Sequence, residues 1–241
     1  MSTLAVYSTK GGVGKTALAV NLAWLAATIS NKRTLLWDLD PQAASTFILA
    51  EDAARAAQAK SLFGTQEDPT NLIVETSTAQ LHLLPADRSL RESDRMLRQA
   101  RVQGTWHETL KILTSNYDFV IVDCSPSLGS TNEHIIRSAS AILVPMIPSP
   151  LAVRACDEIC EYLGTNLTDG PPVFPVFTMV DRRRVAHRAA LAADPGFPVI
   201  PMASAVEMMA DNHGPVGKFA PHSAAALAFL DLWKLVERHI T

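Results

Sequence analysis

The sequence predicts a three-layer α/β sandwich whose central sheet is mostly parallel and has about seven strands. Short apolar segments alternate along the chain with longer segments of helical pattern, which is typical of β-α-β units. One short segment, residues 117–123, is almost continuously apolar, as parallel strands buried on both faces are. The chain has 241 residues and no linker or repeat that would divide it. We therefore expect one domain over residues 1–241.

The apolar segments give the expected strands in chain order. These strands are residues 4–8, 34–38, 81–85, 117–123, 141–145, 173–178 and 197–201. Residues 16–29 contain few polar side chains and predict a helix that is buried on most sides. Residues 224–240 predict a closing helix with one apolar side. That side is expected to carry Leu227, Leu230, Leu235 and Val236.

The composition excludes several classes of protein. Hydrophobic residues make up 48% of the chain and charged residues 19%, a globular balance that argues against disorder and coiled coil. No apolar run reaches the ~18 residues that a membrane-spanning helix needs, and the first residues lack the pattern of a secretory signal. The net charge is −3 and there are three cysteines, so we expect a cytoplasmic protein that is not basic overall.

A glycine-rich turn stands between the first strand and the first helix. Residues 10–16 read K-G-G-V-G-K-T. Glycines let backbone N–H groups approach phosphate oxygens, and the helix that follows adds the positive end of its dipole. Lys15 is expected to neutralise charge on the β- and γ-phosphates, and the Thr16 hydroxyl to bind Mg²⁺. The sequence therefore predicts a phosphate-binding loop for a nucleoside triphosphate.

This turn departs from the usual phosphate-loop pattern, because Thr9 stands where the first glycine is common and Lys10 follows it. In this respect it resembles the deviant Walker A motif of the ParA/MinD family of P-loop ATPases. The resemblance implies that Lys10 reaches across an ATP-sandwich dimer and stabilises transition-state charge on the partner's phosphates, as an arginine finger does. The implied ATP site consists of Lys10, Gly11, Gly12, Val13, Gly14, Lys15, Thr16 and Ala17.

Three acidic residues extend the resemblance. Residues 38–42, D-L-D-P-Q, resemble the family's switch I, and residues 123–129 resemble its switch II. The match implies that Asp38 lies near the Mg²⁺ shell and that Asp40 positions the attacking water. It also implies that Asp123, at the end of the central strand, holds Mg²⁺ through water.

The roles implied by the resemblance fall into two groups. The expected metal residues are Thr16, Asp38 and Asp123. The expected catalytic residues are Lys10, Lys15 and Asp40. Residues 43–46, A-A-S-T, depart from the Gly-Asn that often follows switch I in the family, and the sequence predicts no effect of this change.

Segments that match the family run from residue 4 to about 238. Residues 145–149, 178–182 and 215–221 resemble its later motifs. In the family, the loop that follows the strand at 197–201 touches adenine. The resemblance therefore implies that Pro201, Met202 and Ala203 contact the base.

Four arginines favour the DNA-partition branch of the family. Arg182, Arg183, Arg184 and Arg188 stand beside one acid, Asp181, in a slightly acidic protein. Clustered arginines contact DNA phosphates without reading sequence. The alternative for each of them is a solvated, salt-bridged start of a helix. The first strand begins close to Met1, so we expect no preceding domain that binds an operator.

The resemblance thus implies a small ParA-type ATPase that uses ATP and Mg²⁺. It implies an ATP-dependent homodimer, binding to non-specific DNA, and a ParB-like or analogous activator carried by a cargo such as a plasmid, a chromosome or a protein cluster. The expected location is the cytoplasm, on the nucleoid when ATP is bound, with no membrane contact.

Two alternatives remain open within the family: a MinD-like regulator at the membrane surface, and a nucleotide-loaded scaffold that hydrolyses nothing appreciable without its partner, which the sequence does not separate from the partition ATPase. A MinD-like regulator would bind membrane through its closing helix, but the charges of that helix balance, which favours core packing of Phe229, Leu232, Trp233 and Val236. A cluster-binding reductase would use cysteines. The spacing of Cys156 and Cys160 fits a metal, yet core packing is the better interpretation.

Overall fold

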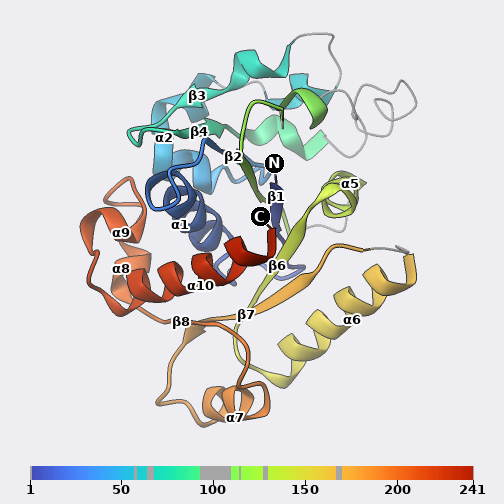
Figure 1. The fold of residues 1–241 in the computed structure, drawn as a ribbon, viewed down its shortest axis with the longest axis vertical. Helices are drawn as coiled ribbons and strands as arrows, with labels where there is room; N and C mark the ends of the chain where they lie inside the picture. The colour runs from blue at the N-terminus through green and yellow to red at the C-terminus, as the bar shows by residue number, and fades with distance from the viewer. Residues whose placement is uncertain are drawn as a thin grey trace.

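An eight-stranded sheet runs through the middle of the protein, in the order β3-β4-β2-β5-β1-β6-β7-β8 (Figure 1). All neighbouring strands are parallel except β3 and β4, which are antiparallel. The computed structural model describes residues 2–56, 59–63, 68–92, 110–113, 115–126, 130–166 and 170–240.

The described strands and helices have the following bounds. The strands are β1 (Ser2–Val6), β2 (Thr34–Asp38), β3 (Val74–Glu75), β4 (Leu81–Leu84), β5 (Phe119–Asp123), β6 (Ala141–Met146), β7 (Val173–Val180) and β8 (Val199–Pro201). The α-helices are α1 (Lys15–Thr28), α2 (Ala44–Ala56), α5 (Ser130–Ser138), α6 (Pro150–Asn166), α7 (Val185–Ala193), α8 (Ser204–Glu207), α9 (Val216–Phe219) and α10 (Ala224–Ile240). Short 3₁₀ turns cover Ala59–Phe63, Pro69–Leu72 and Arg88–Glu92.

The predicted α/β sandwich is confirmed, and each of the seven predicted strands is present with its ends shifted by at most two residues. The eighth strand, β3, was not predicted from the sequence. It consists of Val74 and Glu75 alone, which pair with Leu83 and His82 of β4. Two residues are too few to show an alternation of polar and apolar side chains, so sequence periodicity could not reveal this strand.

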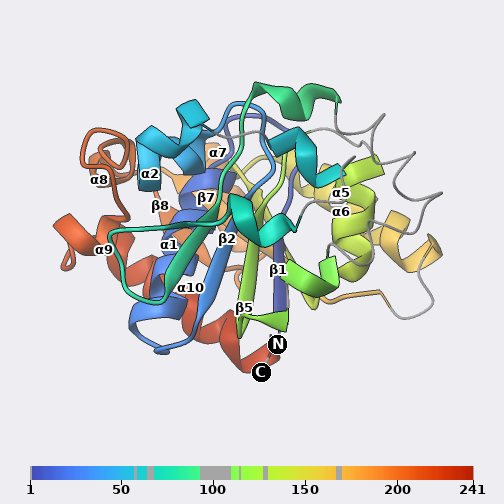
Figure 2. The same cartoon turned by 90° about the horizontal axis from the view of Figure 1, so that it is seen from above.

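Alternate residues of the strands point into two separate cores. In β1, Leu4 and Val6 pack against α1 and α10, whereas Ala5 belongs to the core beneath α5 and α6. The view from above shows the sheet between these two helical layers (Figure 2). Successive side chains of a strand point to opposite faces, so strands between two helical layers need apolar residues at nearly every position.

Helix α1 lies at the centre of one layer and is buried on most sides, and this burial was predicted. Ten of its residues are buried, and it packs against α10 and against the sheet. This burial explains why the segment carries apolar side chains on almost every side, since it contacts the protein all around its circumference.

The apolar side predicted for α10 was partly wrong. Leu227 and Leu235 are 50% and 36% exposed. The buried face instead carries Ala225, Ala226, Phe229, Leu232, Trp233, Val236 and Ile240. These positions recur every three to four residues, whereas Leu227 lies almost opposite Phe229 on the helix. The interpretation that Phe229, Leu232, Trp233 and Val236 pack in the core is confirmed. Among the described residues, no helix combines the length and the apolar character needed to cross a membrane.

Helix α9 is fastened to α1 by a close contact and a buried hydrogen bond. The backbone N–H of Val216 donates to Asn21 Oδ1 at 2.8 Å. A Cβ atom at Gly217 would lie 2.3 Å from Cζ3 of Trp24, which is far closer than van der Waals contact. Glycine at this position therefore lets α9 lie directly on the Trp24 ring.

We predict that Gly217→Ala destabilises the protein by about 1–3 kcal/mol, because the indole ring must move to admit the methyl group. Chemical unfolding measures this change. Gly196→Ala is the matched control, since a Cβ there meets nothing within 4 Å, and its effect should stay within about 0.5 kcal/mol. Equal effects of the two substitutions would contradict the packing argument.

Candidate functional site

The candidate site lies at the edge of the sheet where the parallel strands end. Residues 7–14 leave the end of β1, Asp38 ends β2 and Asp123 ends β5. The strands are in register, with Asp123 beside both Asp38 of β2 and Val6 of β1. Ligands of open α/β sheets bind at this edge, because the loops after neighbouring strands come together there.

The glycine-rich turn forms an open loop at the start of α1. Gly12 and Gly14 have φ angles of 70° and 90°, values that glycine adopts without the steric cost met by other residues. The ammonium group of Lys15 is buried and donates to the backbone carbonyl of Lys10 at 3.1 Å, which closes the loop upon itself. On the far side, the Thr178 hydroxyl donates to the Val13 carbonyl at 2.7 Å. The loop is thus held in shape at both ends.

Hydroxyl groups hold the Asp123 carboxylate, which is fully buried. Its Oδ2 accepts hydrogen bonds from Thr16 Oγ1 at 2.8 Å and from Ser45 Oγ at 2.7 Å. Its Oδ1 is buried and has no hydrogen-bond partner among the described residues. Buried polar atoms are almost always paired, so this oxygen points to a group that completes the site.

The Asp38 carboxylate is also fully buried and lies beside Asp123. Its Oδ2 accepts from the backbone N–H and the hydroxyl of Thr46, at 2.9 and 2.7 Å, and its Oδ1 accepts from the Asp40 N–H at 3.1 Å. Burial, and then the neighbouring charge of Asp123, raises the pKa of Asp38 to about 8. Burial also raises the pKa of Asp123, to about 6, against the hydrogen bonds from Ser45 and Thr16.

These residues fit a magnesium ion. Mg²⁺ in proteins is bound by one or two carboxylates together with water and phosphate oxygens. The site offers two neighbouring acids, a hydroxyl on Thr16 and one unpaired carboxylate oxygen. Within the described ranges, no three His, Cys, Asp or Glu side chains gather as a metal site by themselves. The phosphate oxygens of a bound nucleotide would therefore complete the set of ligands around the ion.

The other two expected catalytic residues lie at the rim of this site. The Asp40 carboxylate is half-buried, and its Oδ1 accepts from the Gln42 N–H at 2.9 Å. Its charge lies close enough to raise the pKa of Asp123 slightly. Lys10 is exposed. The expected catalytic and metal residues are thus gathered at one edge of the sheet.

A second part of the site is an apolar pocket beside the loop. It has a cavity volume of about 70 Å³ and lies against Gly14 and Ala17. Its other wall is formed by Thr178, Met179, Ile200, Pro201, Met202, Ala203, Val206, Glu207 and Phe229. The three residues expected at the base therefore lie next to the phosphate loop, which places an apolar surface where a nucleotide on that loop would extend.

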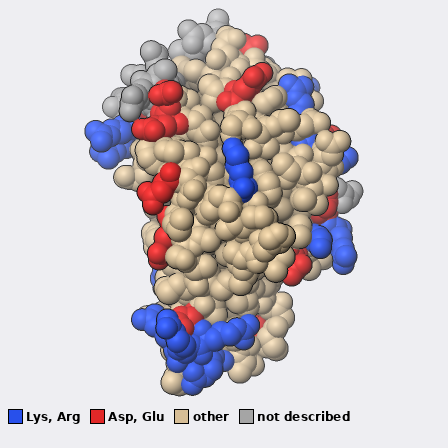
Figure 3. Space-filling model, turned by 90° about the vertical axis from the view of Figure 1, so that its left-hand side faces the viewer, with Lys and Arg blue, Asp and Glu red and all other residues tan. Residues whose placement is uncertain are grey.

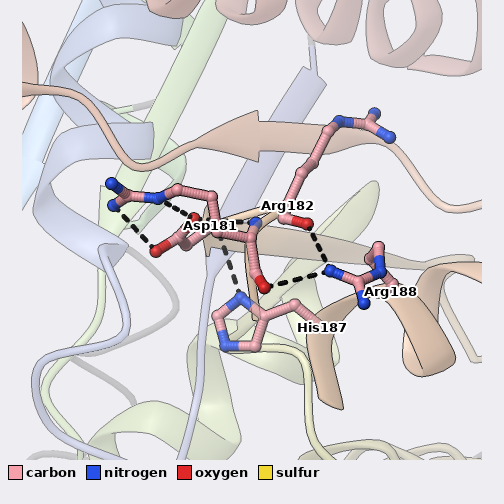
Figure 4. A network of polar contacts seen from close by, with 5 residues as sticks. Asp181, Arg182, His187 and Arg188 are labelled. Atoms are coloured by element: carbon pink, nitrogen blue, oxygen red, sulfur yellow. Dashed lines mark hydrogen bonds and ion pairs between the residues drawn. The ribbon is translucent and has the colours of Figure 1, made fainter. Parts of the chain in front are cut away.

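The arginines expected to bind DNA form a cluster around the start of α7. Lys and Arg side chains gather at this end of the molecule (Figure 3). Arg183 donates from Nε and Nη2 to the two oxygens of Asp181, at 2.9 and 3.0 Å, and these bonds lower the pKa of Asp181 to about 2. Arg188 donates to the backbone carbonyls of Arg182 and Arg183 (Figure 4).

The four arginines are therefore not equivalent. Arg183 has its charge paired, while Arg188 uses one guanidinium nitrogen to hold the loop. The side chain of Arg182 points away from this network (Figure 4). Arg184 is exposed at the N-cap position, directly before α7. Arg182 and Arg184 thus extend the cluster toward solvent.

Sequence reasoning missed two residues of the site. Ser45 and Thr46 lie in the first turn of α2, and each donates a hydrogen bond to one of the two buried acids. The signal was a pair of hydroxyl residues just after switch I, in the segment that departs from the family pattern. Ala43 in the same segment has a φ of 54°, where the family often has glycine, at a cost of about 1–2 kcal/mol. Residues 127–129 of the predicted switch II lie outside the described residues.

Comparisons with known proteins agree with this geometry. The AAA domain family matches residues 1–168. Sporulation initiation inhibitor protein Soj of Bacillus subtilis (strain 168) is 27% identical over 254 aligned residues, which cover 97% of both chains. The virulence plasmid ParA family protein pGP5-D of Chlamydia psittaci is 29% identical over 171 residues, which cover 69% of this chain and 66% of that protein.

A solved structure matches nearly the whole chain. It is cobyrinic acid a,c-diamide synthase from Mycobacterium smegmatis, described with a bound ATP analog and magnesium. The two chains are 26% identical, with 99% of this chain and 95% of the other covered and a TM-score of 0.80.

We predict that Asp38→Asn becomes more stable relative to the wild type as pH rises, in the absence of metal and nucleotide. A raised carboxylate pKa means that the folded chain holds a proton that the unfolded chain has lost, so stability falls as pH rises from about 4 to about 8. The variant should therefore gain more over the wild type at pH 8.5 than at pH 5, on the order of 1–3 kcal/mol. Thermal unfolding at both pH values, with a chelator, measures the difference.

Asp231→Asn, at an exposed position of α10, is the control and should stay within about 0.5 kcal/mol of the wild type at both pH values. A gain for Asp38→Asn that is equal at pH 5 and pH 8.5 would contradict the prediction.

Proposed function

Because the chain belongs to the ParA/MinD family of P-loop ATPases, we propose that it binds Mg-ATP at this site, dimerises around two nucleotides and then binds DNA without sequence preference. Hydrolysis of ATP would release the DNA, and a ParB-like or analogous activator on a cargo would accelerate it. The protein would thereby partition or position that cargo and lie on the nucleoid while ATP is bound. The relatives named Soj and ParA support a partition or positioning ATPase.

One observation gives the main support for nucleotide binding at this site. The glycine-rich loop, its hydroxyl residue Thr16 and the two acids at the strand ends meet at one edge of the sheet, joined by the bond from Thr16 to Asp123. Backbone N–H groups and the first turn of α1 would bind the phosphates. The family relationship and the similar structure with ATP analog and magnesium support the same ligands here.

The residues take distinct parts in the proposed reaction. Thr16, Asp38 and Asp123 would hold Mg²⁺, which when bound neutralises charge on the phosphate oxygens. Lys15 would bind the β- and γ-phosphates from the first turn of α1. Asp40 would accept a hydrogen bond from the attacking water and orient it. The hydrogen bond that Asp40 Oδ1 accepts from the Gln42 N–H holds the carboxylate at the rim of the site.

Lys10 suits a role across a dimer interface. Its backbone carbonyl is tied to Lys15, but its side chain is exposed at the edge of the loop. A cation in this position would reach phosphates bound by a second copy of the chain and stabilise charge in the transition state.

The arginine cluster supports DNA as the surface that is bound. Arg182 and Arg184 are exposed, and their charges suit contact with phosphates. Membrane binding has less support, because Phe229, Leu232 and Trp233 of the closing helix are buried in the core. Pelleting with anionic liposomes and ATP separates the two functions, since the DNA proposal expects no pelleting.

We predict ATP-dependent binding to a random-sequence duplex that weakens steeply as salt rises. The double variant Arg182→Ala, Arg184→Ala should reduce the slope of log K against log salt by about two and weaken binding to all sequences alike. Fluorescence anisotropy with ATP, ADP or no nucleotide measures both effects. Arg154→Ala, on the exposed face of α6, is the control and should leave the slope unchanged. Absence of binding in every nucleotide state would overturn the DNA part of the proposal.

We predict that Lys10→Ala abolishes the ATP-dependent dimer and leaves nucleotide binding by the monomer intact, because its ammonium group would act on the partner's phosphates. Size-exclusion chromatography with ATP, together with binding of a fluorescent nucleotide, tests this. Lys32→Ala, an exposed lysine just before β2, should dimerise as the wild type does. A normal ATP dimer of Lys10→Ala would refute the role given to Lys10.

A further inference from the structure

We propose that Ser45 is the positioning residue that orients the Asp123 carboxylate toward Mg²⁺ and so sets how tightly the metal is held. This inference rests on the proposed function, because it concerns the same nucleotide site. Ser45 would not touch the nucleotide or the metal. It would act through Asp123 alone.

The contact that supports the proposal is short and fully buried. Ser45 Oγ donates to Asp123 Oδ2 at 2.7 Å, and neither residue is exposed to solvent. The two residues are 78 positions apart in the sequence, so the bond joins the start of α2 to the end of β5. A buried bond to a charged acceptor is among the stronger hydrogen bonds in proteins.

Two donors on one oxygen fix the direction of the other oxygen. Thr16 Oγ1 also donates to Asp123 Oδ2. This bond uses the single hydrogen of the Thr16 hydroxyl and leaves the lone pairs of that hydroxyl for a cation. With Oδ2 held by both hydroxyls, the carboxylate is fixed in rotation and Oδ1 is left to accept from the metal's water ligands. Loss of Ser45 would leave only the Thr16 donor on this carboxylate among the described side chains.

The turn that carries Ser45 is itself anchored. The next residue, Thr46, donates to Asp38 Oδ2 and accepts from the Ala86 N–H at 2.9 Å. The first turn of α2 therefore holds both acids of the site at once, and it is tied to the chain that follows β4. Groups that orient ligating carboxylates in this way commonly change metal affinity by 10–100-fold when they are removed.

Mn²⁺ binding to the protein saturated with a non-hydrolysable ATP analogue tests the proposal, because electron paramagnetic resonance measures the metal directly. We expect Ser45→Ala to weaken Mn²⁺ binding about 10-fold. Affinity for the analogue in the presence of a chelator should stay unchanged. Ser45→Cys should weaken Mn²⁺ similarly, since a thiol fills the space but donates poorly, and this variant also serves if the alanine protein does not fold.

Ser138→Ala is the matched control, because Ser138 is exposed on α5 and donates only to the His134 carbonyl among the described contacts. It should bind Mn²⁺ as the wild type does. Mn²⁺ affinity within twofold of the wild type in a folded Ser45→Ala or Ser45→Cys protein would overturn the inference alone. A wild-type protein that binds neither the analogue nor Mn²⁺ would overturn the proposed function as well.

Discussion

Two carboxylates, both buried from water, lie side by side at the ends of β2 and β5. The rest of the site is arranged around these two acids. Their register in the sheet places them together, and burial makes the charge on each costly. The surrounding residues offset this cost. Hydroxyl groups from α1 and α2 donate hydrogen bonds to the acids, and the buried Lys15 lies near Asp123. A divalent cation beside the two acids would offset this cost.

The sequence predicted most of the sheet and the loop because both depend on local signals. Strands buried on two faces need continuous apolar segments, and a phosphate loop needs glycines directly before a helix. Asp38, Asp40 and Asp123 could be assigned by resemblance because each follows a strand with a recognisable sequence around it. These signals act over fewer than about ten residues, which is the range at which sequence patterns are most informative.

The features that could not be predicted depend on contacts between distant segments. Ser45 and Thr46 matter because α2 folds back over the ends of two strands, and no local pattern marks their partners. The orientation of α10 follows from which of its apolar residues meet α1 and the sheet, and the sequence offered several leucines that suited either face. Arg183 likewise differs from its neighbouring arginines because its charge is paired with Asp181, and the sequence alone does not show this difference.

The burial of α1 has a consequence for motion during a catalytic cycle. Its first turn carries Lys15 and Thr16, while most of its length is enclosed by α10 and the sheet. A helix packed on all sides has no room to translate without opening the core, since protein interiors are close-packed. In the proposed reaction, the floor beneath the phosphates would stay fixed, and rearrangement between nucleotide states would fall on the segments that follow β2 and β7. The fold would thus divide the proposed site into a fixed half, which binds the phosphates, and a half that can rearrange with the nucleotide.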